Sequence, residues 1–318
     1  IDLDGSIRFF QALYFCIIHL NLKDFIETEF GMSLKFGTSG LRGLSVDLKG
    51  KASAVYATAF ARHLLASGQA KAGDPILVAR DFRDSSPDVS ATCIAALKKA
   101  GLTPLDCGTV PTPALALYGL SLKAGALMIT GSHIPADRNG IKFNRTDGEV
   151  LKPDEMAIRA QGVALPDLFD DAGMLKDAAP AEPLVDAATP YIARYVDAFG
   201  AQALAGLTLG VYEHSAVGRD ILVALVEALG GKAVSLGRSD RFIPVDTEAV
   251  RPEDQALARQ WAAELGLDAI LSTDGDSDRP LLADEQGVWM RGDVLGIKER
   301  EFILAARSIG TPNRRMVM

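Results

Sequence analysis

The chain has 318 residues, which is too long for one ordinary domain and suits two or three. Its formal net charge of −8 argues against a nucleic-acid or anionic-membrane partner, because either would need a broad basic face. Three cysteines without CxxC spacing give no basis for a disulfide framework or a zinc site, so the cytoplasm is the expected location.

Residues 1–31 differ in character from the rest of the chain. Their apolar run at 9–22 is shorter than the roughly 20 residues that a transmembrane helix needs. They also lack the basic start and the small-residue cleavage site of a signal peptide. Because Met32 opens a segment of different composition, we predict that residues 1–31 are a leader of translated upstream sequence, outside the working protein.

From Met32 onward, short apolar runs alternate with segments of helical periodicity. Residues 51–65 and 87–100 carry apolar side chains at helical spacing, whereas 75–79 and 124–130 are compact apolar runs typical of buried strands. This alternation predicts a mostly parallel sheet that helices cover on both faces.

The stretch 178–190 is rich in Ala, Pro and Asp and is predicted to be a linker. A second strand–helix series follows it, with strands expected at 207–212, 232–236 and 267–272 and helices at 219–229 and 252–265. We therefore place one domain at 32–182 and a second at 183–289.

The segment 290–318 is predicted to be a fragment of a third domain. Residues 291–296 have the composition of a domain opening, but 297–318 show no regular period and are basic. Fewer than about 30 residues cannot close a domain, since domains begin at about 50 residues.

The first candidate binding segment is the glycine-rich run FGTSGLRG at 36–43. Its amides, the hydroxyls of Thr38 and Ser39 and the guanidinium of Arg42 are suited to an oxyanion. The run has neither the Gly-Lys-Ser/Thr ending of a Walker loop nor the spacing of a dinucleotide fingerprint, so both are set aside.

The run DFRDSSP at 81–87 follows a predicted strand and opens a predicted helix. The simpler interpretation of Ser85 and Ser86 is that one of them caps that helix. Arg83 stands where it could face the cleft, so it is a further candidate for phosphate binding.

The run TGSHIP at 130–135 puts Ser132 on a small-residue turn directly after a predicted strand. A serine hydroxyl is a weak nucleophile at its own pKa, but phosphoryl transfer depends mainly on positioning and on neutralising charge. Ser132 is therefore a candidate nucleophile, and Lys142 a candidate proton carrier or phosphate-binding cation. The alternative for Ser132 and His133 is an ordinary solvated turn.

The run DGDSDR at 274–279 places carboxylates at Asp274, Asp276 and Asp278, directly after a predicted strand. Three carboxylates so close repel one another unless a cation lies between them. Mg²⁺ is favoured over Ca²⁺, because three protein carboxylates leave room for a phosphate oxygen and waters. Two alternatives remain, a solvated acidic turn and an EF-hand loop, although Arg279 stands where an EF-hand needs Gly.

Taken together, these motifs resemble the α-D-phosphohexomutase superfamily, which includes phosphomannomutases and phosphoglucomutases. The matching runs are FGTSGLRG (36–43), DFRDSSP (81–87), PTPAL (111–115), TGSHIP (130–135), NGIKF (139–143), DGDSDR (274–279), LLADEQG (281–287) and RGDVLG (291–296). The resemblance implies tandem αβα-sandwich domains with mixed, mostly parallel sheets, the third domain incomplete and the fourth absent.

The resemblance also implies a reaction. Ser132 would carry a phosphoryl group, pass it to a hexose monophosphate and take the other phosphoryl back from a hexose 1,6-bisphosphate, which also serves as activator. Mg²⁺ would be held by the three aspartates and would touch the Ser132 oxygen. Arg42 and Arg279 would line the active centre, and His133 and Lys142 would assist proton movement.

The expected substrate is a mannose or glucose phosphate. The sequence departs from the family pattern at Gly131 and Ile134, where the family commonly has Ala and Asn, and it contains neither the family's sugar-recognition loop nor its later phosphate-gripping loop. Two hypotheses follow. The chain is a phosphohexomutase, or it is a catalytically inactive fragment that only binds metal and anions.

Overall fold

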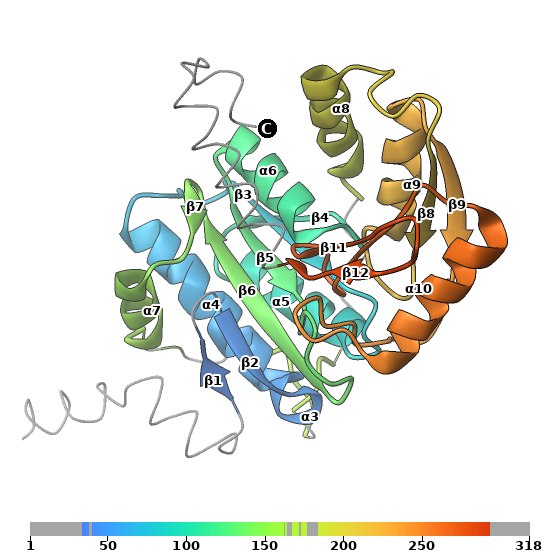
Figure 1. Ribbon diagram of the computed structural model, residues 1–318. Coiled ribbons are helices and arrows are strands. Elements are labelled where there is room, and N and C mark those ends of the chain that lie inside the picture. Colours follow the sequence, from blue (N-terminus) through green and yellow to red (C-terminus); the bar gives the residue numbers. More distant parts are fainter. Residues whose placement is uncertain are drawn as a thin grey trace, which may run out of the picture.

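The chain folds around two β-sheets, which lie side by side in Figure 1. The computed structural model describes residues 34–37, 40–161, 163, 167–171, 173–176 and 184–292. The predicted leader at 1–31 lies outside the described residues, and so does all but the beginning of the segment 290–318.

The first sheet has the strand order β1-β2-β6-β5-β3-β4, and β7 pairs with β6. Its strands are β1 (Lys35–Phe36), β2 (Gly40–Leu44), β3 (Pro75–Arg80), β4 (Thr103–Asp106), β5 (Gly125–Ile129), β6 (Arg138–Arg145) and β7 (Gly148–Glu149). In this sheet β3 pairs in parallel with β4 and β5, and the other described strand pairs are antiparallel. The sheet is mixed, as predicted, but its parallel part is smaller than predicted.

The short connection between β5 and β6 explains this difference. A parallel crossover needs a dozen or more residues, usually including a helix, and residues 130–137 are too few. Strand β6 therefore returns beside β5 in the antiparallel direction, with Ile129 opposite Ile141. The connection is the segment that carries Ser132.

Helices cover both faces of the first sheet. Alternate residues of a strand face opposite sides, so Ile76 and Val78 of β3 pack beneath α4 and α5 while Leu77 and Ala79 pack beneath α6. The helices of this part are α3 (Ser45–Leu48), α4 (Lys51–Ala66), α5 (Ser86–Lys99), α6 (Thr112–Leu122) and α7 (Lys152–Arg159). The layering is the predicted αβα sandwich.

The second sheet has the strand order β12-β11-β10-β8-β9. Its strands are β8 (Thr208–Tyr212), β9 (Lys232–Leu236), β10 (Ala269–Thr273), β11 (Pro280–Ala283) and β12 (Trp289–Met290), and its helices are α8 (Ala188–Phe199), α9 (Arg219–Ala228) and α10 (Pro252–Leu265). Strand β8 pairs in parallel with β9 and β10, whereas β11 and β12 continue the sheet in antiparallel fashion. The aspartate run lies in the turn between β10 and β11.

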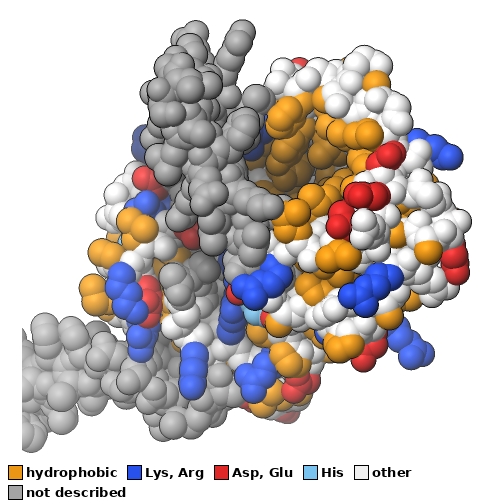
Figure 2. All heavy atoms as spheres, in the orientation of Figure 1, with side chains coloured by type: hydrophobic (Ala, Val, Ile, Leu, Met, Phe, Trp, Pro, Cys, Tyr) orange, Lys and Arg blue, Asp and Glu red, His pale blue; other side chains and the backbone are white. Residues whose placement is uncertain are grey.

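Helix α8 connects the two parts at the margin of their shared apolar cluster, against which its Tyr191 packs. It contacts α6 on one side and α9 on the other, and none of its residues is fully buried. A groove of about 370 Å³ lies between these three helices, lined mainly by Pro111, Pro113, Tyr191, Tyr195, Ile221, Leu222 and Leu225. Figure 2 shows apolar side chains gathered in this hollow.

The two sheets share an apolar cluster. Val217, which precedes α9, and Ala187, which precedes α8, are buried in the same cluster as Leu77 and Met128 of the first sheet. Among the described helices, none is both long and apolar enough to cross a membrane.

Candidate active site

Ser132 lies at the carboxyl end of β5, in a strained backbone conformation. Its φ is 56°, in the left-handed region that side chains other than glycine rarely adopt. The amide of Ser132 donates to the hydroxyl of Thr130 at 2.7 Å, and that hydroxyl donates to a carboxylate oxygen of Asp81 at 2.8 Å. The residue is 1% exposed, so a small set of contacts fixes the direction of its hydroxyl.

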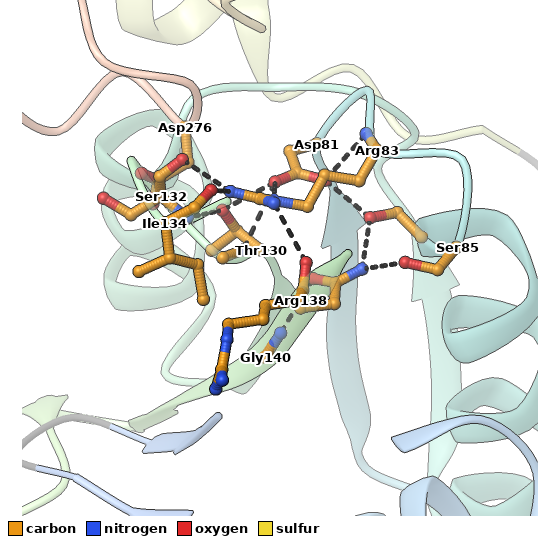
Figure 3. Close-up of polar contacts among 12 residues, drawn as sticks. Asp81, Arg83, Ser85, Thr130, Ser132, Ile134, Arg138, Gly140 and Asp276 are labelled. Atoms are coloured by element: carbon orange, nitrogen blue, oxygen red, sulfur yellow. Dashed lines mark hydrogen bonds and ion pairs between the residues drawn. The ribbon is translucent and has the colours of Figure 1, made fainter. Parts of the chain in front are cut away.

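Arg83 organises the loop 132–138, which we call the serine loop. Its Nη1 donates to the carbonyl oxygens of Pro135 and Arg138 at 2.7 and 2.9 Å. Its Nη2 donates to those of Ser132 and Ile134 at 3.0 and 2.7 Å. Figure 3 shows the guanidinium pointing into this ring of oxygens.

The remaining donor of Arg83, Nε, bonds to Asp81 at 3.1 Å, so all five guanidinium N–H groups are used within the protein. The side chain is 0% exposed. In this arrangement every guanidinium N–H of Arg83 faces the protein, and phosphate binding by Arg83 stays a prediction. A Cβ at Gly131 would lie 2.6 Å from Cζ of Arg83, so glycine lets the guanidinium pass.

The aspartate run meets the serine loop directly. The hydroxyl of Ser132 donates to Oδ2 of Asp274 at 2.5 Å. Thr112, the first residue of α6, donates through its amide to the carbonyl oxygen of Asp276 at 2.9 Å and through its hydroxyl to Oδ2 at 2.5 Å. Thr112 belongs to the run PTPAL, but sequence reasoning gave it no role of its own.

The three aspartates fit a hard metal cation. One carboxylate oxygen from each of Asp274, Asp276 and Asp278 lies within 4.8 Å of the others, and the first two residues are buried. Oδ1 of Asp276 is buried without a hydrogen-bond partner among the described residues. A buried carboxylate oxygen left without a donor, beside two further carboxylates, is the donor set that Mg²⁺ or Ca²⁺ takes.

Lys142 of β6 reaches the same carboxylates from the first sheet. Its Nζ lies 2.6 Å from Oδ2 of Asp276 and 2.5 Å from Oδ2 of Asp278. Burial alone would lower the pKa of Lys142, but the two carboxylates outweigh it and raise that pKa. Burial, and then the charge of Asp276, raises the pKa of Asp274 well above its ordinary value.

His133 lies beside the Ser132 hydroxyl, and Arg279 lies near His133 and Asp274. Nδ1 of His133 lies 3.2 Å from Oγ of Ser132. Burial lowers the pKa of His133, and the nearby guanidinium of Arg279 lowers it further. The amide of Arg279 donates to Oδ1 of Asp274 at 3.3 Å, and its guanidinium reaches Glu248 at 3.1 Å.

Arg42 of β2 also lies beside this site. Strand β2 pairs with β6, which puts Arg42 opposite Gly140 and Gly40 opposite Lys142. The charge of Arg42 contributes to the lowered pKa of His133. Thr38 and Ser39, the other predicted anion-binding residues, lie outside the described residues.

The described sequence-predicted residues therefore gather at one junction between the two sheets, with Arg83 behind the serine loop. It brings a serine hydroxyl, an imidazole, an ammonium group and three carboxylates together. Such a junction, at the carboxyl ends of β5 and β10, is where αβ proteins place ligand sites.

Comparison with known proteins shows the family of the chain. Residues 33–162 match the family profile described as phosphoglucomutase/phosphomannomutase, alpha/beta/alpha domain I, and residues 189–287 match that of domain II. The chain belongs to the phosphohexomutase superfamily.

The relatives are longer than this chain. A phosphomannomutase of Sinorhizobium fredii is 51% identical over 281 residues, covering 88% of this chain and 59% of that protein. A phosphomannomutase of Salmonella muenchen is 44% identical, covering 83% and 53%. A phosphoglucosamine mutase of Rhodococcus erythropolis is 32% identical, covering 83% and 59%. The chain thus spans little more than half the length of these relatives.

Solved structures show the same fold. A phosphoglucomutase/phosphomannomutase family protein from Burkholderia thailandensis aligns with a TM-score of 0.63 at 24% identity, covering 86% of this chain and 58% of that one. A protein from Thermus thermophilus, described as a putative phosphomannomutase, aligns with a TM-score of 0.63 at 23% identity, covering 81% and 59%.

Proposed function

We propose that this chain carries the phosphoryl-transfer centre of a phosphohexomutase, which interconverts hexose 6-phosphate and hexose 1-phosphate through phosphorylated Ser132. The observation that carries the proposal is the hydrogen bond from the Ser132 hydroxyl to Asp274. It brings the candidate nucleophile of the first sheet against the acidic loop of the second, where a bound cation could offset charge on a phosphoryl group.

In the proposed reaction the bond between phosphorus and Oγ of Ser132 breaks as a sugar hydroxyl forms a new bond to phosphorus. The sugar hydroxyl loses its proton in this step and Oγ of Ser132 gains one, and His133, with Nδ1 3.2 Å from that Oγ, is the proposed carrier of the proton. Lys142, which Asp276 and Asp278 hold, is the proposed cation for the transferred group. Arg42 and Arg279 supply further positive charge.

Mg²⁺ is the proposed cofactor, held by Asp274, Asp276 and Asp278 together with an oxygen on Ser132. When bound, it would offset negative charge on the phosphoryl group. Hexose 1,6-bisphosphate is the proposed intermediate and activator. The domain boundaries at 182/183 and 289/290 also stay proposals.

A mannose or glucose phosphate is the proposed substrate. Two relatives named phosphomannomutase are 51% and 44% identical, whereas a relative named phosphoglucosamine mutase is 32% identical. A cytoplasmic location is supported by Cys93 and Cys107, which are buried free thiols.

The second candidate function is a catalytically inactive fragment that only binds metal and anions. It needs only Asp274, Asp276 and Asp278, whose carboxylate oxygens lie within 4.8 Å of one another and could hold a cation without any transfer to Ser132.

Mass spectrometry separates the two functions. The full chain is incubated with glucose 1,6-bisphosphate and Mg²⁺, and phosphate on Ser132 is measured before and after mannose 1-phosphate is added. Phosphate that appears on Ser132 and is lost to the monophosphate supports transfer, and Ser132→Ala should carry none. A chain that binds Mg²⁺ but never gains phosphate would overturn the proposal in favour of the inactive fragment.

A further inference from the structure

Two arginine–aromatic contacts cross the boundary between the two sheets in opposite directions. Arg83, which follows β3, lies with its Cζ 4.0 Å from the ring centre of Phe242 in the second part. Arg219, the first residue of α9, lies with its Cζ 4.3 Å from the ring centre of Phe82 in the first part. Each part thus gives one cation and one ring to the junction.

Phe242 lies where the serine loop meets the run 274–279, which we call the aspartate loop. A Cβ at Gly275 would lie 3.1 Å from the Phe242 ring and 2.8 Å from the carbonyl oxygen of Ser132. That same carbonyl oxygen accepts from Arg83. The ring therefore covers the guanidinium that shapes the serine loop and touches the loop that carries the aspartates.

Arg219 holds the segment on which Phe242 stands. Its Nη1 donates to the carbonyl oxygen of Ser239 at 2.9 Å, three residues before Phe242. On the other side, the amide of Ile243 donates to the hydroxyl of Ser215 at 2.7 Å. Arg219 is 8% exposed, so its charge is largely withdrawn from water and faces Phe82. One arginine thereby links both contacts.

We propose that Phe242 and Arg219 are positioning residues, which dock the aspartate loop against the serine loop and so set the separation of Ser132 from Asp274. A cation buried against an aromatic face is attracted more strongly than an exposed one, because water no longer competes for it. The docking stands on its own geometry, and only its consequence for turnover rests on the proposed function.

Hydrogen–deuterium exchange of the full chain tests the docking without any need for activity. Phe242→Leu keeps an apolar side chain but removes the ring. We expect amides at 131–134 and 274–277 to exchange about tenfold faster, while those of α4 keep their rate. Phe242→Tyr keeps the ring and should restore slow exchange.

Tyr195→Leu is the matched control. It removes the ring of another arginine–aromatic pair, Arg194 with Tyr195 at 5.9 Å, which lies within α8 and does not cross the boundary. Exchange in the two loops should stay at the wild-type rate. Unchanged exchange in Phe242→Leu would overturn the docking role, and so would faster exchange throughout α4, which indicates general instability.

A second arm measures the rate at which glucose 1,6-bisphosphate phosphorylates Ser132. We expect Phe242→Leu and Arg219→Gln to slow it about tenfold, in step with the change in exchange. If the loop amides exchange faster but the phosphorylation rate is unchanged, the docking does not affect the phosphorylation of Ser132, and that part of the proposal is refuted. If the wild type gains no phosphate while the exchange pattern is as expected, the proposed function fails and the docking stands.

Discussion

His214 lies buried beneath the aspartate loop, and one of its ring nitrogens holds that loop in place. Nε2 is 2.9 Å from the carbonyl oxygen of Thr273, the residue before Asp274. Nδ1 is buried without a hydrogen-bond partner among the described residues. Burial lowers the pKa of His214 to about 4, so at neutral pH the ring is uncharged and Nε2 donates to Thr273.

The low pKa of His214 predicts a loss of stability in mild acid. The ordinary value is 6.5, so between pH 6.5 and about pH 4 the unfolded chain binds a proton that the folded chain does not. The free energy of unfolding therefore falls as the pH drops through that window, by about 3 kcal/mol over the whole window. Urea unfolding at several pH values measures it. His214→Gln should show a flatter dependence, and a slope equal to that of the wild type would contradict this origin.

At the scale of elements, the pairing of β2 with β6 depends on a glycine. A Cβ at Gly40 would lie 2.0 Å from the carbonyl oxygen of Ile141 and 2.8 Å from Cα of Lys142. Close approach at this point places Arg42 and Lys142 on neighbouring strands beside the serine loop.

Gly40→Ala should therefore destabilise the chain, because β2 must move away from β6. We expect the free energy of unfolding to drop by about 1–3 kcal/mol. Gly37→Ala is the matched control, since its Cβ would meet its nearest neighbour at 3.6 Å without a clash. Thermal unfolding compares the two, and equal melting temperatures would contradict the prediction.

The regular elements with a continuous apolar pattern could be predicted from sequence. The strand expected at 75–79 is β3, that at 124–130 is β5, and the helix expected at 252–265 is α10. Strands β2 and β6 were not predicted, because their residues are the Gly, Arg, Asn and Lys of the candidate site rather than an apolar run. In these strands the polar residues of the candidate site interrupt the apolar pattern by which a strand is predicted.

The candidate site was predictable where spacing alone brings groups together. Alternate positions in one turn place Asp274, Asp276 and Asp278 near one point. The part that Arg83 plays in shaping the serine loop could not be predicted, because four of its five donors go to backbone carbonyls, which exist at every position and give no sequence signal. Phe242 gave no sequence signal either, since its role depends on a contact between distant segments.

At the scale of the whole molecule, the shared apolar cluster ties the two sheets into one unit. Val217 is 4% exposed, packs among residues of the first sheet, and donates its amide to the carbonyl oxygen of Gly275 at 3.0 Å. Separating the sheets would expose this cluster and break the hydrogen bond between Ser132 of the serine loop and Asp274 of the aspartate loop.

We therefore expect the chain to unfold in one calorimetric transition. Val217→Asp buries an unpaired charge in the junction and should split that transition or lower it strongly. Val46→Asp, at a valine that is 78% exposed, should leave it nearly unchanged. Two separate transitions in the wild type would show that the sheets fold independently.

The left-handed backbone conformation of Ser132 lowers the stability of the chain at the residue proposed to react. With φ at 56°, this position suits glycine, while a residue with a Cβ is disfavoured by about 1–2 kcal/mol. Ser132→Gly should therefore be more stable than Ser132→Ala by about that amount, although both lose the hydroxyl. Chemical denaturation of the two variants checks this, and equal midpoints would contradict it. The serine at position 132 thus makes the chain less stable than glycine would, which is consistent with the proposed role of its hydroxyl oxygen.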